Sequence, residues 1–185
     1  AVASSESSPG RLFAGSQRAV YESTDQGQWW QERFRLPSQA QVRSLALASG
    51  EKPVILLATN HGVYTSAGGD AHWTRTYKGV GAAQADCRYV AFHPSQPGVA
   101  LLGTAAGLRI SIDRGAHWNP VAAPPSLRDV VHFAFDPQDH APLFVLTPTI
   151  LFEGRLHEGS WQERFRTGST EEFGVEEGLD AQETA

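Results

Sequence analysis

Tryptophan and the apolar residues around it recur along the chain at a nearly constant interval. Successive repeating tryptophans are 43, 45 and 43 residues apart, at Trp30, Trp73, Trp118 and Trp161. Repeats of this length are typical of propeller blades, each of which is a small antiparallel sheet. The pattern therefore predicts an all-β chain built from about four repeats.

Two short apolar strands separated by a turn precede each tryptophan. Large apolar residues stand seventeen positions before it, at Phe13, Leu56, Leu101 and Phe144. A second apolar position lies ten residues before it, at Val20, Val63, Leu108 and Leu151. Gly62 and Gly107 fall between the two strands in copies two and three, where a tight turn is needed. Each copy thus predicts a β-hairpin.

Two further strands complete each repeat. Apolar triplets with a central alanine precede the hairpin in the last three copies, at Leu45–Leu47, Val90–Phe92 and Phe133–Phe135. A fourth strand is expected to start at the tryptophan, as in Trp30–Phe34 and Trp161–Phe165. The sequence therefore predicts a β-propeller of four-stranded antiparallel blades over residues 1–166, with blades at about 1–35, 36–79, 80–123 and 124–166.

The same alignment places the start of the chain inside a blade, because Val2–Ser4 falls where the first strand of copy one belongs. This leaves two arrangements open: a ring of four blades, or a partial propeller, such as half of an eight-bladed assembly. Unpaired blade edges would favour self-association in the second arrangement. Residues 167–185 carry six acidic and no basic residues, which predicts a disordered acidic tail, with a closing strand around Phe173–Val175 as the alternative.

Composition narrows the classes of partner. A formal net charge of -5 gives the chain no overall attraction to phosphate backbones, so no nucleic-acid partner is expected. Cys87 is the only cysteine, which excludes an intramolecular disulfide and a zinc site with several cysteines. The sequence contains no apolar run of about 18 to 20 residues, so no transmembrane segment is predicted.

A turn motif of the form Ser-x-Asp-x-Gly-x-x-Trp lies between the third and fourth strands. It is intact at Ser23–Trp30, with Asp25 and Gly27, and again at Ser111–Trp118. The second of these contains Asp113 and Gly115. The second copy keeps Ser66 and Trp73, and the fourth keeps only Trp161. An aspartate can accept hydrogen bonds from backbone N–H groups ahead of it, and glycine can adopt φ > 0. The motif therefore predicts a structural hairpin corner.

These motifs resemble the Asp-box, or BNR, repeats of sialidases, some secreted glycoside hydrolases, sortilin-type receptor propellers and photosystem II stability/assembly factors. The resemblance covers roughly residues 2–166. It implies that the box is structural and lies away from any catalytic centre, so Asp25 and Asp113 are not expected to be catalytic. It also implies a location outside the cytoplasm, periplasmic, secreted or lumenal, as in much of the family.

Residues for catalysis or metal binding do not form a recognisable pattern. A sialidase resemblance would imply an arginine cluster, a Tyr/Glu nucleophilic pair and an acid/base aspartate, but the Arg-Ile-Pro signature of that family is absent. The acidic candidates Asp86, Asp129 and Asp136 are interpreted as turn or cap residues. The seven histidines include no close His-x-x-x-His pair. We therefore expect no catalytic residue, metal or cofactor, and a chain that is not an enzyme.

Two arginines are the candidates for partner binding. Arg43 and Arg88 stand thirty residues before the tryptophan in copies two and three, at the start of the innermost strand. Innermost strands line the channel of a propeller, so these side chains could present positive charge to an acidic partner. The photosystem assembly-factor resemblance implies an arginine-rich recognition patch. The alternative is that both arginines are solvated or locally paired.

The sequence thus predicts a non-catalytic propeller scaffold for protein–protein interaction or complex assembly. The alternative is a carbohydrate-binding or glycoside-hydrolase-type propeller, or a fragment of a larger one. That class would place exposed aromatic side chains beside carboxylates on one face. All five tryptophans belong to the box region instead, which favours the scaffold over a glycan-binding protein.

Overall fold

The structure is a computed structural model that describes residues 1–4, 10–48, 53–67, 72–136, 142–156 and 158–168. Sixteen strands in these residues form four antiparallel sheets of four strands, each in chain order. We call the sheets blades 1 to 4. The predicted tail, including the alternative strand at 173–175, lies outside the described residues apart from positions 167 and 168.

The blades follow one another along the chain. Blade 1 contains β1 (Val2–Ser4), β2 (Leu12–Gly15), β3 (Ala19–Ser23) and β4 (Gln31–Arg35). Blade 2 contains β5 (Val42–Ala48), β6 (Val54–Thr59), β7 (Gly62–Ala67) and β8 (Thr74–Tyr77). Blade 3 contains β9 (Cys87–Phe92), β10 (Ala100–Thr104), β11 (Gly107–Ser111) and β12 (Asn119–Pro120). Blade 4 contains β13 (His132–Phe135), β14 (Leu143–Leu146), β15 (Ile150–Arg155) and β16 (Ser160–Arg166).

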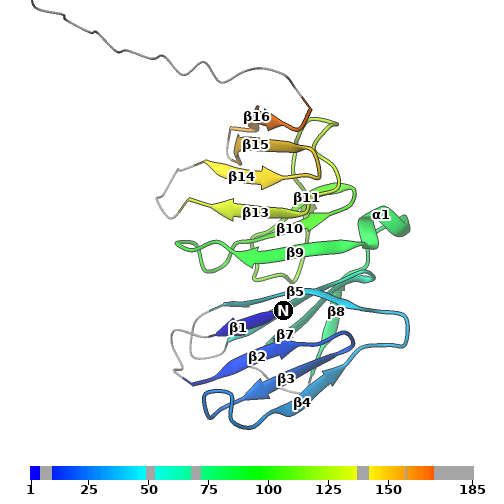
Figure 1. Ribbon diagram of the computed structural model, residues 1–185, viewed down its shortest axis with the longest axis vertical. Coiled ribbons are helices and arrows are strands. Elements are labelled where there is room, and N and C mark those ends of the chain that lie inside the picture. Colours follow the sequence, from blue (N-terminus) through cyan, green and yellow to red (C-terminus); the bar gives the residue numbers. More distant parts are fainter. Residues whose placement is uncertain (5–9, 49–52, 68–71, 137–141, 157, 169–185) are drawn as a thin grey trace, which may run out of the picture.

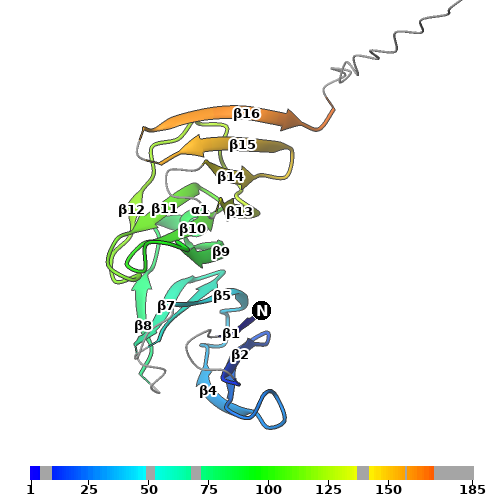
Figure 2. The same ribbon diagram turned by 90° about the vertical axis from the view of Figure 1, so that its left-hand side faces the viewer.

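The four blades form a curved row, with blade 1 and blade 4 at opposite ends (Figure 1). The first strands of the blades, β1, β5, β9 and β13, lie on the concave side of the row. Strands β8 and β12 lie on the convex side (Figure 2). The first strand of each blade is therefore the innermost one, as the sequence predicts.

Apolar residues between neighbouring blades form three core clusters. Blade 1 places Phe13 and Val20 against Ile55, Leu57 and Tyr64 of blade 2. The other two clusters join blade 2 to blade 3 around Leu56, Val63, Val90 and Leu102, and blade 3 to blade 4 around Leu101, Leu108, Phe133 and Phe152. Each buried side chain of this size stabilises the fold by about 1.5–3 kcal/mol. The apolar positions of the repeat are thus the contacts between blades.

The burial of the second strands distinguishes inner blades from end blades. Every residue of β6 and β10 is buried, because both faces of blades 2 and 3 are covered. In contrast, β2 has one buried residue, Phe13, among partly exposed ones, and β14 alternates between buried residues and residues that are partly or fully exposed. Successive residues of a strand point to opposite faces, so blades 1 and 4 each have one face that the described chain leaves uncovered.

Two details differ from the sequence prediction. The fourth strand begins one residue after the tryptophan in blades 1 to 3, and in blade 3 it contains only Asn119 and Pro120. Pro120 lacks a backbone N–H, which limits the pairing of that strand. The structure also contains a short helix that the sequence pattern does not predict, α1 (Gly81–Ala85).

No helix among the described residues is both long and apolar enough to cross a membrane.

Candidate functional site

The two candidate arginines lie side by side at the starts of neighbouring inner strands. Arg43 is the second residue of β5, and Arg88 is the second residue of β9. Backbone hydrogen bonds to hairpin turns fix these strand starts: Val42 N donates to Gln17 O at 3.0 Å, and Ala105 N donates to Asp86 O at 3.1 Å. The concave side therefore presents both arginines at the end of the blades that carries the β2–β3 and β10–β11 turns.

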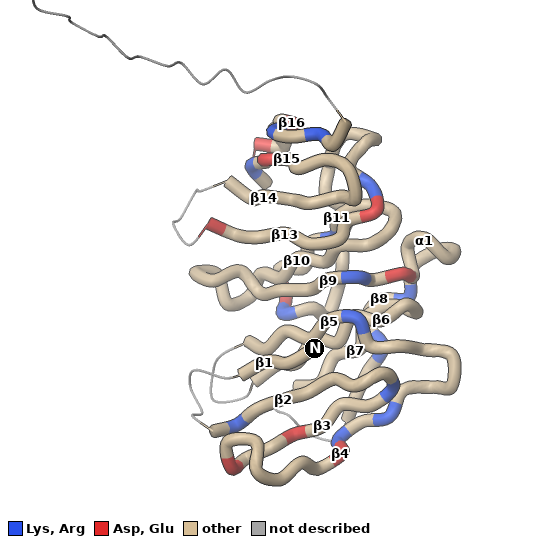
Figure 3. The backbone as a smooth tube through the Cα atoms, in the orientation of Figure 1, with Lys and Arg blue, Asp and Glu red and all other residues tan. Residues whose placement is uncertain are grey.

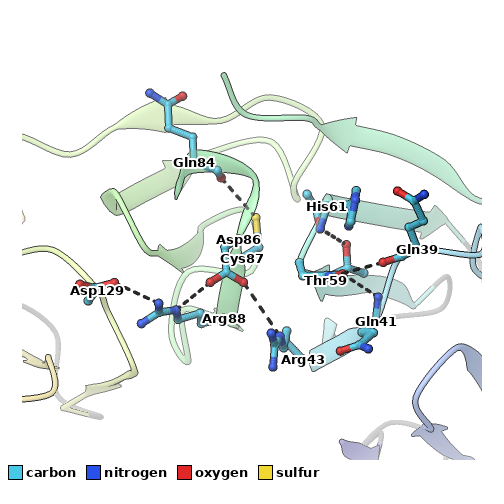
Figure 4. A network of polar contacts seen from close by, with 12 residues as sticks. Gln39, Gln41, Arg43, Thr59, His61, Gln84, Asp86, Cys87, Arg88 and Asp129 are labelled. Carbon is cyan, nitrogen blue, oxygen red and sulfur yellow. Dashed lines mark hydrogen bonds and ion pairs between the residues drawn. The ribbon is translucent and has the colours of Figure 1, made fainter. Parts of the chain in front are cut away.

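Carboxylates connect the two arginines (Figure 4). Arg88 Nε donates to Asp86 Oδ2 at 3.1 Å, and Arg88 Nη2 donates to Asp129 Oδ1 at 3.0 Å. Arg43 Nε lies 4.0 Å from Asp86 Oδ1, too far for a hydrogen bond. Asp86 Oδ1 is buried and accepts no hydrogen bond from the described residues. Local pairing, one of the two alternatives raised by the sequence, is therefore present in the structure.

Pairing leaves the two arginines unequally available. The Arg88 side chain is 30% exposed and is held from both sides, since Asp86 and Asp129 occupy different nitrogens. The Arg43 side chain is 47% exposed, and its only ion pair with a described residue is the long contact to Asp86. Arg43 can therefore donate hydrogen bonds to a carboxylate of another molecule without breaking one to a described residue.

Three further basic residues lie at the same end of the strands as this pair. Arg18, Lys78 and Arg128 are exposed, and none of them makes an ion pair with a described residue. Arg18 follows Gln17 in the turn that contacts Val42, and Arg128 precedes Asp129. Figure 3 shows Lys and Arg gathered along this side of blades 1 to 3. We call the set the arginine face; it consists of Arg18, Arg43, Lys78, Arg88 and Arg128 with Asp86 and Asp129.

The arginine face carries an excess of positive charge within an acidic chain. Five basic side chains stand against two carboxylates, whereas the whole chain has a formal net charge of -5. Beside the arginine face, the β6–β7 turn is held to the segment before β5, because Asn60 Oδ1 accepts a hydrogen bond from Gln41 N at 2.6 Å. Sequence reasoning singled out Arg43 and Arg88 but not Arg18, Lys78 and Arg128, because the last three do not recur at one repeat position.

The box turns lie at the opposite end of the strands, between β3 and β4 and between β11 and β12. In the first turn, Ser23 Oγ donates to Asp25 Oδ1 at 2.7 Å, and Trp29 N donates to the same oxygen at 2.9 Å. Gly27 N donates to Ser23 Oγ at 2.8 Å, and Trp30 Nε1 donates to Gly27 O at 3.0 Å. Ser111, Asp113, Gly115 and Trp118 make the same four contacts in blade 3 at 2.7 to 3.1 Å.

These contacts hold the box carboxylates in their charged form. The pKa of Asp25 is lowered by hydrogen bonds from Trp29 N–H and Ser23. The pKa of Asp113 is lowered to about 2, chiefly by the backbone N–H and the imidazole of His117. Both carboxylates accept hydrogen bonds within their own turns, which fits the structural role expected from the sequence.

The repeat tryptophans of blades 2 to 4 contact the preceding blade. Trp73 stacks on Phe34 of blade 1, with ring centroids 4.8 Å apart and planes inclined by 14°. Trp118 packs against the core cluster that joins blades 2 and 3. Trp161 Nε1 donates to Ala122 O at 2.8 Å. Ser66 is completely buried in β7. Trp30 has no preceding blade in the described chain and is 36% exposed.

Of the acidic candidates, Asp86 and Asp129 lie together and Asp136 lies apart from them. The Arg88 guanidinium lies between Asp86 and Asp129, while Asp136 follows the far end of β13. Cys87 is fully buried, and its burial, followed by the charge of Asp86, raises the pKa of its thiol to about 12. Within the described part of the chain, no three His, Cys, Asp or Glu side chains converge in a way that could hold a metal ion.

A pocket between blades 3 and 4 is a second site that sequence reasoning missed. It has a volume of about 200 Å³, and its lining includes His93, Ile110, Phe135, Arg155 and Glu158. The rings of His93 and Phe135 lie 4.8 Å apart, and Arg155 Nη1 lies 4.0 Å from Glu158 Oε1. The pocket thus combines an aromatic ring with a carboxylate.

Comparison with known proteins places the fold. No protein-family model and no curated protein sequence matches the chain. Among solved structures, an ancestral GH74 enzyme superposes with a TM-score of 0.72 at 18% identity, over 89% of this chain and 25% of that one. YCF48 bound to D1 peptide gives 0.62 at 14% identity, over 86% and 52%. The extracellular domain of a hybrid two-component system from B. thetaiotaomicron gives 0.65 at 16%, over 85% and 21%.

The fold is a four-bladed β-propeller arrangement. All-β sheets in chain order and these superpositions agree on it. The propeller chain spans between about a fifth and about half of the length of these structures. At identities of 18% and below, the likeness concerns the fold alone, and the neighbours include both an enzyme and a protein bound to a peptide.

Proposed function

We propose that this propeller is a non-catalytic scaffold that binds an acidic segment of a protein partner through the arginine face. The observation that carries the proposal is the convergence of Arg43 and Arg88 on Asp86, with three basic residues at the same end of the strands that make no ion pair with a described residue. YCF48, a structure of similar fold, is bound to a peptide, which supports peptide recognition as a use of this architecture.

The geometry suggests how an acidic segment is held. Arg88 is fixed in direction by Asp86 and Asp129, so its remaining N–H groups are oriented before binding. Arg43 has an exposed planar guanidinium that suits bidentate contact with a carboxylate. Arg18, Lys78 and Arg128 add long-range attraction, which salt will weaken.

A peptide titration tests this proposal. The probe is a fluorescein-labelled peptide of eight glutamates, and the readout is fluorescence anisotropy at low ionic strength. We expect Arg43→Glu to weaken binding at least about tenfold, since a direct contact to a charged group contributes about 1.5–3 kcal/mol.

Arg114→Glu is the matched control for that titration. Arg114 is exposed in the box turn of blade 3, at the other end of the strands, and the change alters net charge by the same amount. Equal loss of affinity in Arg43→Glu and Arg114→Glu would mean that only overall charge matters and would contradict a site at the arginine face.

A second function is favoured by the pocket between blades 3 and 4. Its aromatic ring and carboxylate are the side chains that a carbohydrate-binding propeller uses, and a GH74 enzyme shares the fold. Calorimetric titration with soluble β-glucan oligosaccharides tests this function. Binding that is lost in Phe135→Ala and retained in Arg43→Glu would favour it over the protein scaffold.

The proposal includes a place of action outside the cytoplasm. One protein of similar fold is an extracellular domain, which supports this location. Fractionation of the source cells, followed by immunodetection of the chain, tests it directly.

A further inference from the structure

The uncovered face of blade 4 is apolar at the positions that bind the next blade elsewhere in the chain. Strand pairing aligns Leu146, Leu151 and Phe165 in one row on this face. Leu146 is 43% and Phe165 is 48% exposed. Leu151 is the repeat counterpart of Val20, Val63 and Leu108, all of which are buried against the following blade. Blade 4 therefore carries an interface pattern that no described residue of the chain covers.

This face resembles the face by which blade 1 contacts blade 2. The sequence Trp-Gln-Glu-Arg-Phe-Arg is identical at 30–35 and 161–166. In blade 1, Glu22 is buried and pairs with Arg33 at 2.5 Å. The counterpart pair in blade 4 joins Glu153 to Arg164 at 2.6 Å, with the Arg164 side chain 49% exposed.

The interface between blades 1 and 2 shows which side chains pack on a face of this kind. Phe34 of blade 1 contacts two rings of blade 2: Trp73, stacked at 4.8 Å, and Tyr64, at 5.4 Å and 49°. Phe165 is the counterpart of Phe34. A matching partner would therefore present a tyrosine and a tryptophan at the positions of Tyr64 and Trp73.

Blade 1 of the same chain presents this pair of rings on its own uncovered face. Tyr21 is the counterpart of Tyr64, and Trp30 is the counterpart of Trp73. Trp30 is 36% exposed and Val2, on the same face, is 72% exposed. Blades 3 and 4 keep the tryptophan, as Trp118 and Trp161, but have Arg109 and Phe152 in place of the tyrosine. Each end of the row thus carries one half of the Phe–Tyr–Trp contact.

We propose that two copies of the chain associate head to tail, with Phe165 of each copy packed on Tyr21 and Trp30 of the other. Such an interface is heterologous, and it forms a ring when the rotation between subunits closes. The blades of one chain form a curved row (Figure 2), which favours closure. Two copies joined in this way form a ring of eight blades with the inner strands around one channel. The proposal is independent of the peptide-binding function.

One position requires the new interface to differ from the internal ones. Leu146 stands where blades 1 and 3 have Gly15 and Gly103. A Cβ at Gly15 would come within 2.7 Å of Val42 Cγ1, and at Gly103 within 2.6 Å of Val130 Cγ1, both from the following blade. Leu146 lies at one end of the row formed with Leu151 and Phe165. The partner must therefore leave more space beside Leu146 than blades 2 and 4 leave beside those glycines.

Light scattering after size-exclusion chromatography, together with native mass spectrometry, tests the proposal. The chain at micromolar concentration is expected to have twice its 20.0 kDa mass. Phe165→Glu and Trp30→Glu should each give a monomer with an unchanged circular dichroism spectrum. Val80→Glu, at a residue that is 84% exposed beside α1, is the control and should remain a dimer.

Mixing the variants distinguishes this interface from a symmetric one. Phe165→Glu retains a normal blade 1 face and Trp30→Glu retains a normal blade 4 face, so an equimolar mixture can form one intact head-to-tail contact. We expect a mixed dimer from two variants that do not self-associate. A monomeric parent chain, a larger oligomer, or a mixture that stays monomeric would overturn the proposal, whatever the peptide titration shows.

Discussion

At the residue scale, a few polar side chains determine the shape of the box turns. Asp113 accepts hydrogen bonds from Ser111 Oγ and from His117 N, and its second oxygen lies 2.6 Å from His117 Nδ1. Ser111 in turn accepts the N–H of Gly115. The spacing of the motif specifies these contacts, so the hydrogen bonds to Asp113 could be expected from the sequence. The imidazole contact was not predicted, because it depends on a rotamer of an exposed side chain.

Asp113→Ala should lower the free energy of unfolding by about 1–2 kcal/mol, because two backbone or hydroxyl donors lose their acceptor. Chemical denaturation at neutral pH measures the loss. Glu158→Ala, which removes an exposed carboxylate 4.0 Å from Arg155, is the control and should change stability little.

The contribution of Asp113 should also depend on pH. Its pKa in the folded chain is about 2, below the usual value of 3.8, so the stabilisation is complete above about pH 4. It should be lost as the pH falls from about 4 to about 2. Thermal unfolding of the parent chain and Asp113→Ala across this range should show converging midpoints, and a constant difference would contradict the assignment.

At the element scale, the hairpins between second and third strands share one turn. Thr59 Oγ1 donates to Gly62 O at 2.8 Å, and Thr104 Oγ1 donates to Gly107 O at 2.8 Å. Both glycines have positive φ, 109° and 122°. The two apolar strands with a glycine between them made these hairpins predictable. Helix α1 was not predictable, because it has only five residues and no side-chain cap.

Gly62→Ala and Gly107→Ala should differ although they occupy the same turn position. An added Cβ would lie 2.0 Å from Tyr77 O at Gly62 and 3.2 Å from Leu127 O at Gly107. Backbone strain costs on the order of 1–3 kcal/mol at both positions, and Gly62→Ala adds a clash with a rigid backbone oxygen. Urea denaturation should rank Gly62→Ala as clearly less stable; equal midpoints would contradict the close approach of β8.

At the scale of the whole molecule, the repeat predicted the number of blades and the order of strands, because nearly the same interval between tryptophans recurs along the chain. It did not predict contacts between residues from different blades. Arg88 and Asp129 are 41 residues apart in sequence and pair at 3.0 Å because neighbouring blades bring their inner strands together. The pocket beside Phe135 depends in the same way on the angle between blades 3 and 4.

Hydrogen–deuterium exchange with and without the eight-glutamate peptide tests the central claim, that the arginine face is the binding surface. The account predicts added protection at the starts of β5 and β9 and in the β6–β7 turn, with no change in the box turns at the other end of the blades. Protection confined to the pocket lined by His93 and Phe135, or no change anywhere at saturating peptide, would contradict it.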